Sequence, residues 1–143
     1  MSDSCLFCRI VDGSVPATRV YEDETSIAFL DLYPVTPGHV LVIPRKHSIA
    51  LHDAEPTTLA NLLPSIQRVA RGLCHALQVE GFNLKQNNGS VAGQVIPHLH
   101  FHLIPRRIED GLTHWPSSAS NTTDQEVLAA RIAASIHATS PEV

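Results

Sequence analysis

Histidine alternates with large apolar residues between Pro97 and Arg107, where the sequence reads Pro-His-Leu-His-Phe-His-Leu-Ile-Pro-Arg-Arg. Because side chains on a strand point alternately to opposite faces, an extended backbone places His98, His100 and His102 on one face. Neighbouring histidines of that face lie roughly 6 to 7 Å apart, close enough for two rings to share a metal ion or a small anion. A helix would scatter the three rings around its axis. We therefore expect a strand with one chemically active face.

The three histidines have three interpretations. As half-buried structural residues, each neutral ring needs hydrogen-bond partners for both of its nitrogens, which makes an accidental cluster costly. As metal ligands, several rings bind one ion. As a nucleophile, one unprotonated ring attacks an electrophile, which the ordinary histidine pKa of about 6.5 permits at neutral pH. The residues themselves leave the choice between metal and nucleophile open.

A second candidate site is the Cys-x-x-Cys segment formed by Cys5 and Cys8. This spacing is common in zinc sites, because two thiolates on a tight turn can face one ion. It requires further ligands, for which histidines are the obvious candidates. The N-terminal residues lack the basic-then-apolar order of a signal peptide, so we expect a cytoplasmic protein whose thiols stay reduced.

The composition is that of an ordinary globular protein. The 143 residues suit one domain, and 43% of them are hydrophobic and 17% charged. A formal net charge of -4 argues against a general nucleic-acid binder. No apolar stretch approaches the length of a membrane span, so we expect neither nucleic acid nor a membrane as partner.

The elements that must position these residues are strands and two helices. Strands are expected at 19–22, 26–31, 39–44 and 81–86, followed by the histidine run as a fifth. Apolar residues at helical spacing predict a long helix from about 55 to 78, in which Pro64 predicts a kink or a later start. A short final helix is expected at about 123–137. The order indicates an α+β fold, a five-stranded antiparallel sheet with the long helix on one face and a short C-terminal helix.

Two loops add candidate residues for anion binding. The loop 87–94 is rich in glycine and amide side chains, and such loops can bring backbone N–H groups to a phosphate. It leads directly into the histidine run. Arg45 and Lys46 follow the third strand, where they could bind an anion or form a solvated turn.

Together, these features resemble the histidine triad (HIT) family, and most closely its Hint-like branch. The resemblance covers roughly residues 5–107, with residues 108–143 as a C-terminal tail and helix of a single HIT domain. It is carried by His98-Leu-His-Phe-His-Leu-Ile-Pro-Arg, the strand-initial His39, the Asn-x-Gly-Ser loop and the leading cysteines. Phe29-Leu-Asp31, His39–Pro44 and His114-Trp-Pro116 add to it. Family members are homodimeric hydrolases or transferases that act on nucleotides at the α-phosphorus.

The resemblance implies a role for each matching residue. His100 would be the nucleophile and form a covalent nucleotidyl-histidine, which water then hydrolyses. His102 would hydrogen-bond the phosphoryl oxygens or the leaving group, and His39 and His98 would complete the cluster. Gln94 would reach the phosphate, with help from backbone donors around Val95. The residues expected to bind the ribose and the base are Asp31, Asn87, Phe7, Ile10, Phe29 and Leu32; for the last four the rival interpretation is core packing.

The resemblance also implies a structural zinc ion, a homodimer and a substrate class. Zinc would be held by Cys5, Cys8, His47 and His98. The substrates would be purine nucleotide conjugates, such as adenosine phosphoramidates, dinucleoside polyphosphates or aminoacyl adenylates. Two rival functions remain open, a metallohydrolase with catalytic zinc on the triad and a nucleotide- or partner-binding module with vestigial turnover.

Overall fold

The computed structural model describes residues 4–139, and its core is a five-stranded antiparallel sheet. The strands are β1 (Arg19–Glu22), β2 (Ser26–Leu30), β3 (Val40–Pro44), β4 (Gly81–Lys85) and β5 (Phe101–Arg106), in the spatial order β1-β2-β3-β5-β4. β1 and β2 form a hairpin, and β5 lies between β3 and β4. The expected fold class is confirmed.

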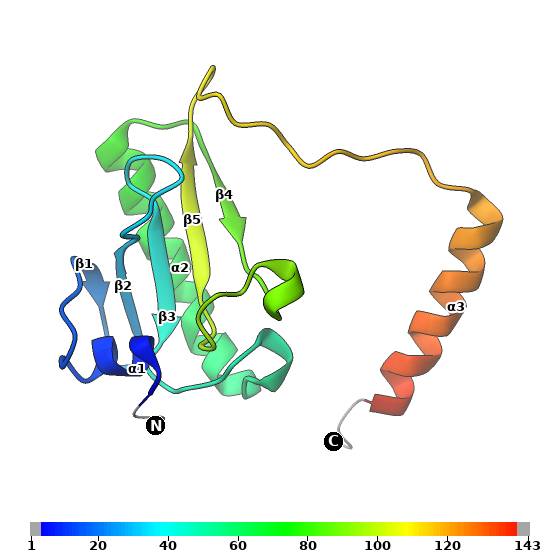
Figure 1. The fold of residues 1–143 in the computed structure, drawn as a ribbon, viewed down its shortest axis with the longest axis horizontal. Helices are drawn as coiled ribbons and strands as arrows, with labels where there is room; N and C mark the ends of the chain where they lie inside the picture. The colour runs from blue at the N-terminus through cyan, green and yellow to red at the C-terminus, as the bar shows by residue number, and fades with distance from the viewer. Residues whose placement is uncertain (1–3, 140–143) are drawn as a thin grey trace. The chain divides into compact units, whose positions relative to one another are not determined.

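Two helices cover the two faces of the sheet, α2 (Pro56–Leu77) on one and the short α1 (Leu6–Val11) on the other (Figure 1). The alternation of strand side chains decides which residues meet which helix. Val40 and Val42 of β3 pack with α2, whereas Leu41 and Ile43 pack with α1. The strands β2 and β3 are therefore buried on both sides, whereas β1 and β4 are largely exposed.

The long helix matches its prediction except at Pro64. It begins with Pro56 in its first turn and ends at Gln78 in the left-handed conformation. Pro64 lies inside the helix on an exposed side, and the helix continues through it. A proline at this position removes one backbone hydrogen bond on the solvent side, where water can replace it. The prediction of a later start was wrong.

The histidine run is only partly a strand. β5 begins at Phe101, so that His102 lies on the strand and His98 and His100 precede it in an irregular segment. The expected segregation of side chains nevertheless holds, because Leu99 and Leu103 belong to the core beside α2 and are fully buried. The histidines consequently point to the face of the sheet that carries α1.

Three smaller features complete the description. Two single-turn 3₁₀ helices occupy Leu51–Asp53 and Ser90–Ala92. The chain divides into two units, of which the first ends at Asp110 and the second begins at Gly111. The second contains α3 (Thr122–Thr139), whose apolar residues Val127, Leu128, Ile132 and Ile136 are exposed. None of the described helices is long and apolar enough to cross a membrane.

Candidate active site and metal centre

A cavity of about 410 Å³ opens beside the histidines on the α1 face of the sheet. One end is apolar, where Phe7 and Ile10 of α1 meet Phe29 of β2. These three side chains are also buried in the core, so that the cavity interpretation and the packing interpretation both apply. Leu32 lines the rim and is 86% exposed. Asp31, His100 and His102 line the polar part.

His100 has one ring nitrogen committed to the backbone. Its Nδ1–H donates to the carbonyl oxygen of His98 at 2.6 Å. In a neutral ring the lone pair is then on Nε2, which is the requirement for nucleophilic attack. Burial lowers the pKa of His100, although the His98 carbonyl and Asp31 both act in the opposite direction. The buried ring also packs edge-on against Phe7, with ring centroids 5.2 Å apart.

The hydrogens of His39 and His102 are fixed by a chain that starts at a backbone amide. The N–H of Val35 donates to Nδ1 of His39 at 3.1 Å. A neutral His39 must therefore carry its hydrogen on Nε2, which donates to Nδ1 of His102 at 2.8 Å. His102 in turn carries its hydrogen on Nε2. That nitrogen is a hydrogen-bond donor on the ring that lines the cavity.

Both histidines are neutral near pH 7. Burial lowers the pKa of His102 to about 4, and the adjacent His100 and His39 add to this effect. Burial also lowers the pKa of His39, against the attraction of Asp31. The Asp31 carboxylate lies 3.6 Å from His39 Nε2 and 4.0 Å from His102 Nδ1. Its other oxygen accepts the backbone N–H of Tyr33, so a negative charge is held at the cavity wall.

The loop residues expected at the phosphate occupy different positions. Asn87 is buried, lines the cavity and donates to the Gly93 carbonyl. Val95 lines the cavity rim and is 85% exposed. The Gln94 amide instead binds the loop itself, accepting from the N–H of Gly89 and donating to the carbonyls of Ile49 and Ile96. In this conformation Gln94 holds the loop in shape, and its role at a phosphate stays a prediction.

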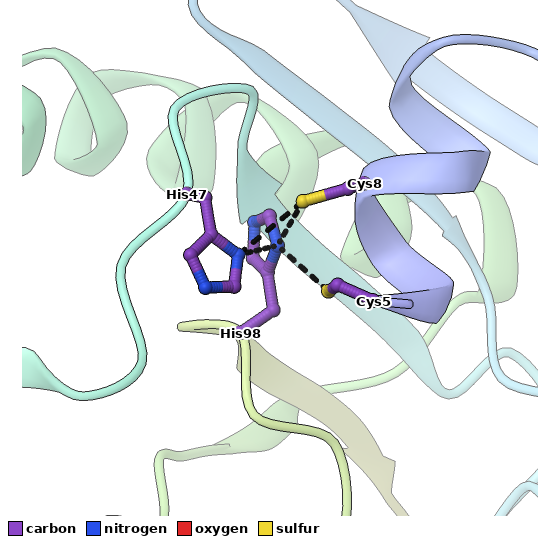
Figure 2. Close-up of side chains that lie close together, drawn as sticks. All are labelled: Cys5, Cys8, His47 and His98. Atoms are coloured by element: carbon purple, nitrogen blue, oxygen red, sulfur yellow. Dashed lines mark hydrogen bonds between the residues drawn. The ribbon is translucent and has the colours of Figure 1, made fainter. Parts of the chain in front are cut away.

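The four expected zinc ligands form a second cluster (Figure 2). Nδ1 of His98 lies 3.6 Å from both cysteine sulfurs and 3.3 Å from Nδ1 of His47, which is itself 3.3 Å from the Cys8 sulfur. Ligand atoms of a tetrahedral zinc site are spaced at roughly 3.3 to 3.6 Å when Zn–N is about 2.0 Å and Zn–S about 2.3 Å. The donor set and its spacing therefore fit zinc.

The orientation of His98 supports the same conclusion. Its Nε2–H donates to the carbonyl of Pro44 at 2.9 Å, which leaves the lone pair on Nδ1, facing the cysteines. The ring is fully buried, and burial lowers its pKa to about 4. Cys5 and Cys8 come from the start of α1, a short helix where the sequence predicted only a tight turn.

A further group of metal-ligand type contains Asp31, His39 and His102. The hydrogen-bond chain argues against a catalytic metal here. His39 Nε2 carries the hydrogen that bonds His102, and a protonated nitrogen cannot bind a metal ion. The two nitrogens are also 2.8 Å apart, closer than the roughly 3.3 Å expected of two histidine ligands on one ion.

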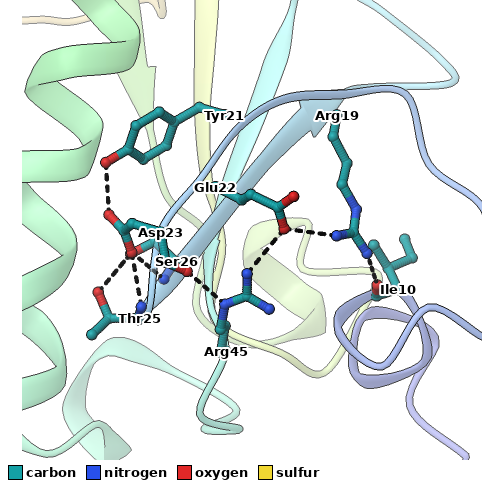
Figure 3. Close-up of polar contacts among 8 residues, drawn as sticks. All are labelled: Ile10, Arg19, Tyr21, Glu22, Asp23, Thr25, Ser26 and Arg45. Atoms are coloured by element: carbon teal, nitrogen blue, oxygen red, sulfur yellow. Dashed lines mark hydrogen bonds and ion pairs between the residues drawn. The ribbon is translucent and has the colours of Figure 1, made fainter.

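The two basic residues after β3 are paired with carboxylates. Arg45 bonds Glu22 at 3.0 Å and the Asp23 carbonyl, so that it ties the β1–β2 hairpin to the end of β3 (Figure 3). Lys46 forms an ion pair with Glu55 at 2.5 Å. Both side chains therefore stabilise surface turns, and the structure favours that interpretation over an anion site.

Two of the residues that sequence reasoning missed bear directly on the chemistry of the site. Val35 acts through its backbone N–H, for which a side-chain pattern gives no signal. Lys85 lines the cavity as the cross-strand partner of His102. It precedes Asn87 by two positions on an extended segment, and that spacing could have placed both on one face.

Comparison with known proteins gives one family throughout. The model of the HIT domain matches residues 12–109. The Schizosaccharomyces pombe protein named adenosine 5'-monophosphoramidase hnt1 is 38% identical, over 93% of this chain and 98% of its own. The Arabidopsis thaliana protein named adenylylsulfatase HINT3 is 36% identical, over 83% of this chain and 59% of its own.

Solved structures agree with this result. SMU.412c from Streptococcus mutans has a TM-score of 0.89 at 38% identity and covers 95% of this chain and 87% of its own. The histidine triad nucleotide-binding protein of Candida albicans has a TM-score of 0.85 at 32% identity, with 96% and 100% covered. A zinc-bound histidine triad family protein from Mycobacterium smegmatis has a TM-score of 0.74 at 39% identity, with 96% and 99% covered.

Proposed function

Because the chain belongs to the histidine triad family, we propose that it is a hydrolase of purine nucleotide conjugates that acts at the α-phosphorus through a nucleotidyl-His100 intermediate. The observation that carries this proposal is the neutral ring of His100, whose Nδ1–H is held by the His98 carbonyl beside an open cavity. Adenosine 5'-monophosphoramidase is the name of relatives with 37–38% identity. Adenosine phosphoramidate is therefore the first substrate to test, ahead of dinucleoside polyphosphates and aminoacyl adenylates.

The cavity suggests a position for each part of the nucleotide. The base enters the apolar end between Phe7, Ile10 and Phe29. The ribose hydroxyls donate to the Asp31 carboxylate, which is an acceptor at neutral pH. The α-phosphate then lies against His100 and His102, with Asn87 beside the sugar-phosphate.

The reaction proceeds in two displacements. The lone pair on His100 Nε2 attacks phosphorus, and the bond to the leaving group breaks with its electron pair. The Nε2–H of His102 donates a hydrogen bond to a phosphoryl oxygen or to the leaving atom as negative charge develops there. The leaving amine takes up a proton from solvent water, and the water that attacks in the second step returns a proton to solvent. Water then attacks phosphorus, the P–N bond to His100 breaks, and the nucleoside monophosphate departs with the ring restored.

The zinc cluster has a structural role in this proposal. Cys5, Cys8, His47 and His98 are the residues that would hold the ion, a closed set with no open position for substrate. A bound zinc ion would tie α1 to the loop after β3 and to the segment before β5. The zinc-bound M. smegmatis relative supports this assignment.

We also propose a cytoplasmic homodimer. Zinc binding by Cys5 and Cys8 requires reduced thiolates, which a cytoplasmic environment maintains. β4 is an outer strand of the sheet, so one of its edges has no partner strand in the described part of the chain. An open strand edge can pair with a second copy. Light scattering after size exclusion should give twice the chain mass of 15.6 kDa.

The test of the proposed function is turnover of adenosine 5'-phosphoramidate by the wild type and by His100→Ala. We expect the substitution to lower kcat by about a thousandfold or more, while calorimetry still detects AMP binding. The matched control is His52→Ala, because His52 is exposed on a surface turn. Full activity of His100→Ala would contradict the mechanism. Tight AMP binding by a wild type that turns over no conjugate would favour the binding-module alternative.

A further inference from the structure

Lys85 is the charged residue of the cavity that the mechanism above leaves without a role. Among residues 4–139, Lys85 is the one Lys or Arg side chain that lines this cavity. It is directly paired with His102 across β4 and β5. Directly paired residues of an antiparallel sheet project to the same face, so the Lys85 side chain and the His102 ring lie on the same side.

The cavity residues are arranged in order across the sheet. The apolar end for the base is formed by α1 and β2, the histidines lie on and before β5, and Lys85 lies on the outer strand β4. In the proposed binding mode, with the base in the apolar end and phosphorus at His100, this strand order places the leaving group toward β4. Attack in line with the breaking bond requires the leaving group to lie opposite His100 Nε2. Lys85 is thus on the leaving-group side.

The Lys85 ammonium has no counter-charge of its own in the described part of the chain. The other lysine, Lys46, is paired with Glu55, whereas no ion pair of Lys85 is found within residues 4–139. Its charge nevertheless reaches the site. Burial is the main cause of the lowered pKa values of His39 and His102, and the Lys85 charge is a smaller effect that lowers both in the same direction. The one carboxylate of the cavity, Asp31, lies on the opposite side of the histidines and is assigned to the ribose.

The hydrogen-bond chain of the histidines favours one kind of leaving group. His102 Nε2–H can donate a hydrogen bond, but a neutral ring does not readily give up that hydrogen. A leaving amine must gain a proton as it departs. A sulfate or phosphate departs as a stable anion without a proton, and it needs a positive charge nearby instead.

We propose that Lys85 is a specificity-determining residue that binds the anionic leaving group of a nucleotide conjugate, so that it raises kcat/KM for sulfate or phosphate leaving groups relative to amines. The inference rests on the proposed function. In the step concerned, His100 Nε2 bonds to phosphorus, the P–O bond to sulfate or phosphate breaks, and its electron pair stays on the departing oxygen beside Lys85. No proton is transferred in that displacement.

The experiment compares three substrates that share the adenylyl group and differ in what leaves. They are adenosine 5'-phosphoramidate, adenylyl sulfate and diadenosine triphosphate. The variants are Lys85→Met, which keeps the length and removes the charge, and Lys85→Arg, which keeps the charge. Lys46→Met is the matched control. The quantity measured is the ratio of kcat/KM for each anionic-leaving substrate to kcat/KM for the phosphoramidate, at low and at high salt.

We expect Lys85→Met to lower this ratio by about fivefold at low salt. Lys85→Arg and Lys46→Met should retain the wild-type ratio, and added salt should reduce the wild-type ratio toward that of Lys85→Met because an exposed charge is screened. A fall for adenylyl sulfate alone would assign Lys85 to sulfate, and a fall for diadenosine triphosphate alone would assign it to phosphate.

An unchanged ratio in Lys85→Met, or an equal loss on all three substrates, would overturn the inference while leaving the proposed function intact. The wild-type activity on the phosphoramidate separates the two cases. A wild type that turns over none of the three substrates would overturn the proposed function and the inference together.

Discussion

At the scale of single residues, the backbone sets the protonation state of the site. The N–H of Val35 and the carbonyls of Pro44 and His98 each bind one nitrogen of a buried histidine. A neutral imidazole has one donor and one acceptor, so that fixing one nitrogen determines what the other can do. Three backbone groups thereby give chemically identical rings different roles. His39 becomes a hydrogen-bond donor, His98 a metal ligand and His100 a nucleophile.

His39 is a positioning residue whose removal should disturb His102 without removing any group from the cavity. In His39→Ala we expect kcat on the phosphoramidate to fall about tenfold or more, with a smaller change in KM, because His102 is then free to carry its hydrogen on Nδ1. Nitrogen-15 chemical shifts of His102 should show the change of tautomer. His75→Ala, on an exposed side of α2, is the control. Equal losses in both variants would contradict this role.

The buried histidines also make stability depend on pH. The pKa of His102 is about 4 in the folded protein, because of burial and then the nearby histidines, against about 6.5 when unfolded. The unfolded chain therefore binds the proton first as the pH falls. Stability is fully present above about pH 6.5 and should decline toward pH 4, by about 1.4 kcal/mol per pKa unit at most.

Urea unfolding between pH 7.5 and 4.5 measures this dependence. His102→Asn should show a shallower decline over the same interval than the wild type, because the group that takes up the proton on unfolding is gone. Identical slopes in the two proteins would exclude a contribution from His102.

At the scale of elements, the sequence predicts the helices and strands that have a repeating pattern of apolar residues, and it misses those that are too short to show one. The long helix has many apolar residues at one spacing, and its bounds of 55–78 differ little from Pro56–Leu77. The strands likewise lie within one or two residues of their predicted ranges, except for the start of β5. α1 has six residues, too few for a helical period to be recognised.

Positions fixed by single contacts could not be predicted in this way. The alternation of histidines continues from His98 to His102, yet the strand starts at Phe101, because the backbone N–H of Leu99 bonds Ser48, in the loop after β3, rather than a partner strand. The Gln94 amide binds three backbone groups of its surroundings. Neither contact leaves a pattern in residue types. The family resemblance predicted which residues form the site. The structure added which nitrogen of each histidine carries the hydrogen, and on which side of the sheet Lys85 lies.

The turn between β1 and β2 is held by one carboxylate. Asp23 accepts from the N–H and hydroxyl of Thr25, the N–H of Ser26 and the hydroxyl of Tyr21 (Figure 3). It also accepts from the hydroxyl of Ser65. Partial burial raises its pKa, but these hydrogen bonds outweigh burial and hold the pKa well below its ordinary value. The hairpin is thereby fastened to α2 through Ser65.

Asp23→Ala should lower the free energy of unfolding by about 1–3 kcal/mol, since it leaves the buried hydroxyl of Ser65 without this acceptor. Chemical denaturation measures the loss. Asp53→Ala, on a surface turn, should change stability by less than about 0.5 kcal/mol. The Asp23 contribution is present above pH 4 and is lost only in strong acid, because the folded pKa is depressed. A loss no larger than that of the control would contradict the assigned role of Asp23.

At the scale of the whole molecule, the metal cluster joins segments that are far apart in the chain. Cys5 directly precedes α1 and Cys8 lies in it, His47 follows β3 and His98 precedes β5. The predicted ion would thus connect three parts of the first unit around the cavity. α1 has only six residues and supplies much of the apolar end of that cavity.

Removal of the metal should therefore loosen α1 first. We expect exhaustive chelation to lower the thermal midpoint by about 5 °C or more, and zinc, measured by atomic absorption, should be present at about one ion per chain before treatment. Cys5→Ser should lose the ion, whereas Cys74→Ser, in α2, should retain it. A protein purified without metal and unaffected by chelator would contradict the zinc assignment.

The backbone and the side chain of His98 serve different centres. Its ring faces the cysteines, while its carbonyl oxygen accepts the Nδ1–H of the nucleophile. Any replacement of this residue removes the metal ligand but keeps the backbone carbonyl. Mutation can therefore separate metal binding from the positioning of His100. A His98→Ala protein that loses the ion yet still forms the nucleotidyl adduct would show that the nucleophile depends on the local path of the main chain. A protein that loses both would show that the His98 ring maintains that path, through the ion or through its hydrogen bond to the Pro44 carbonyl.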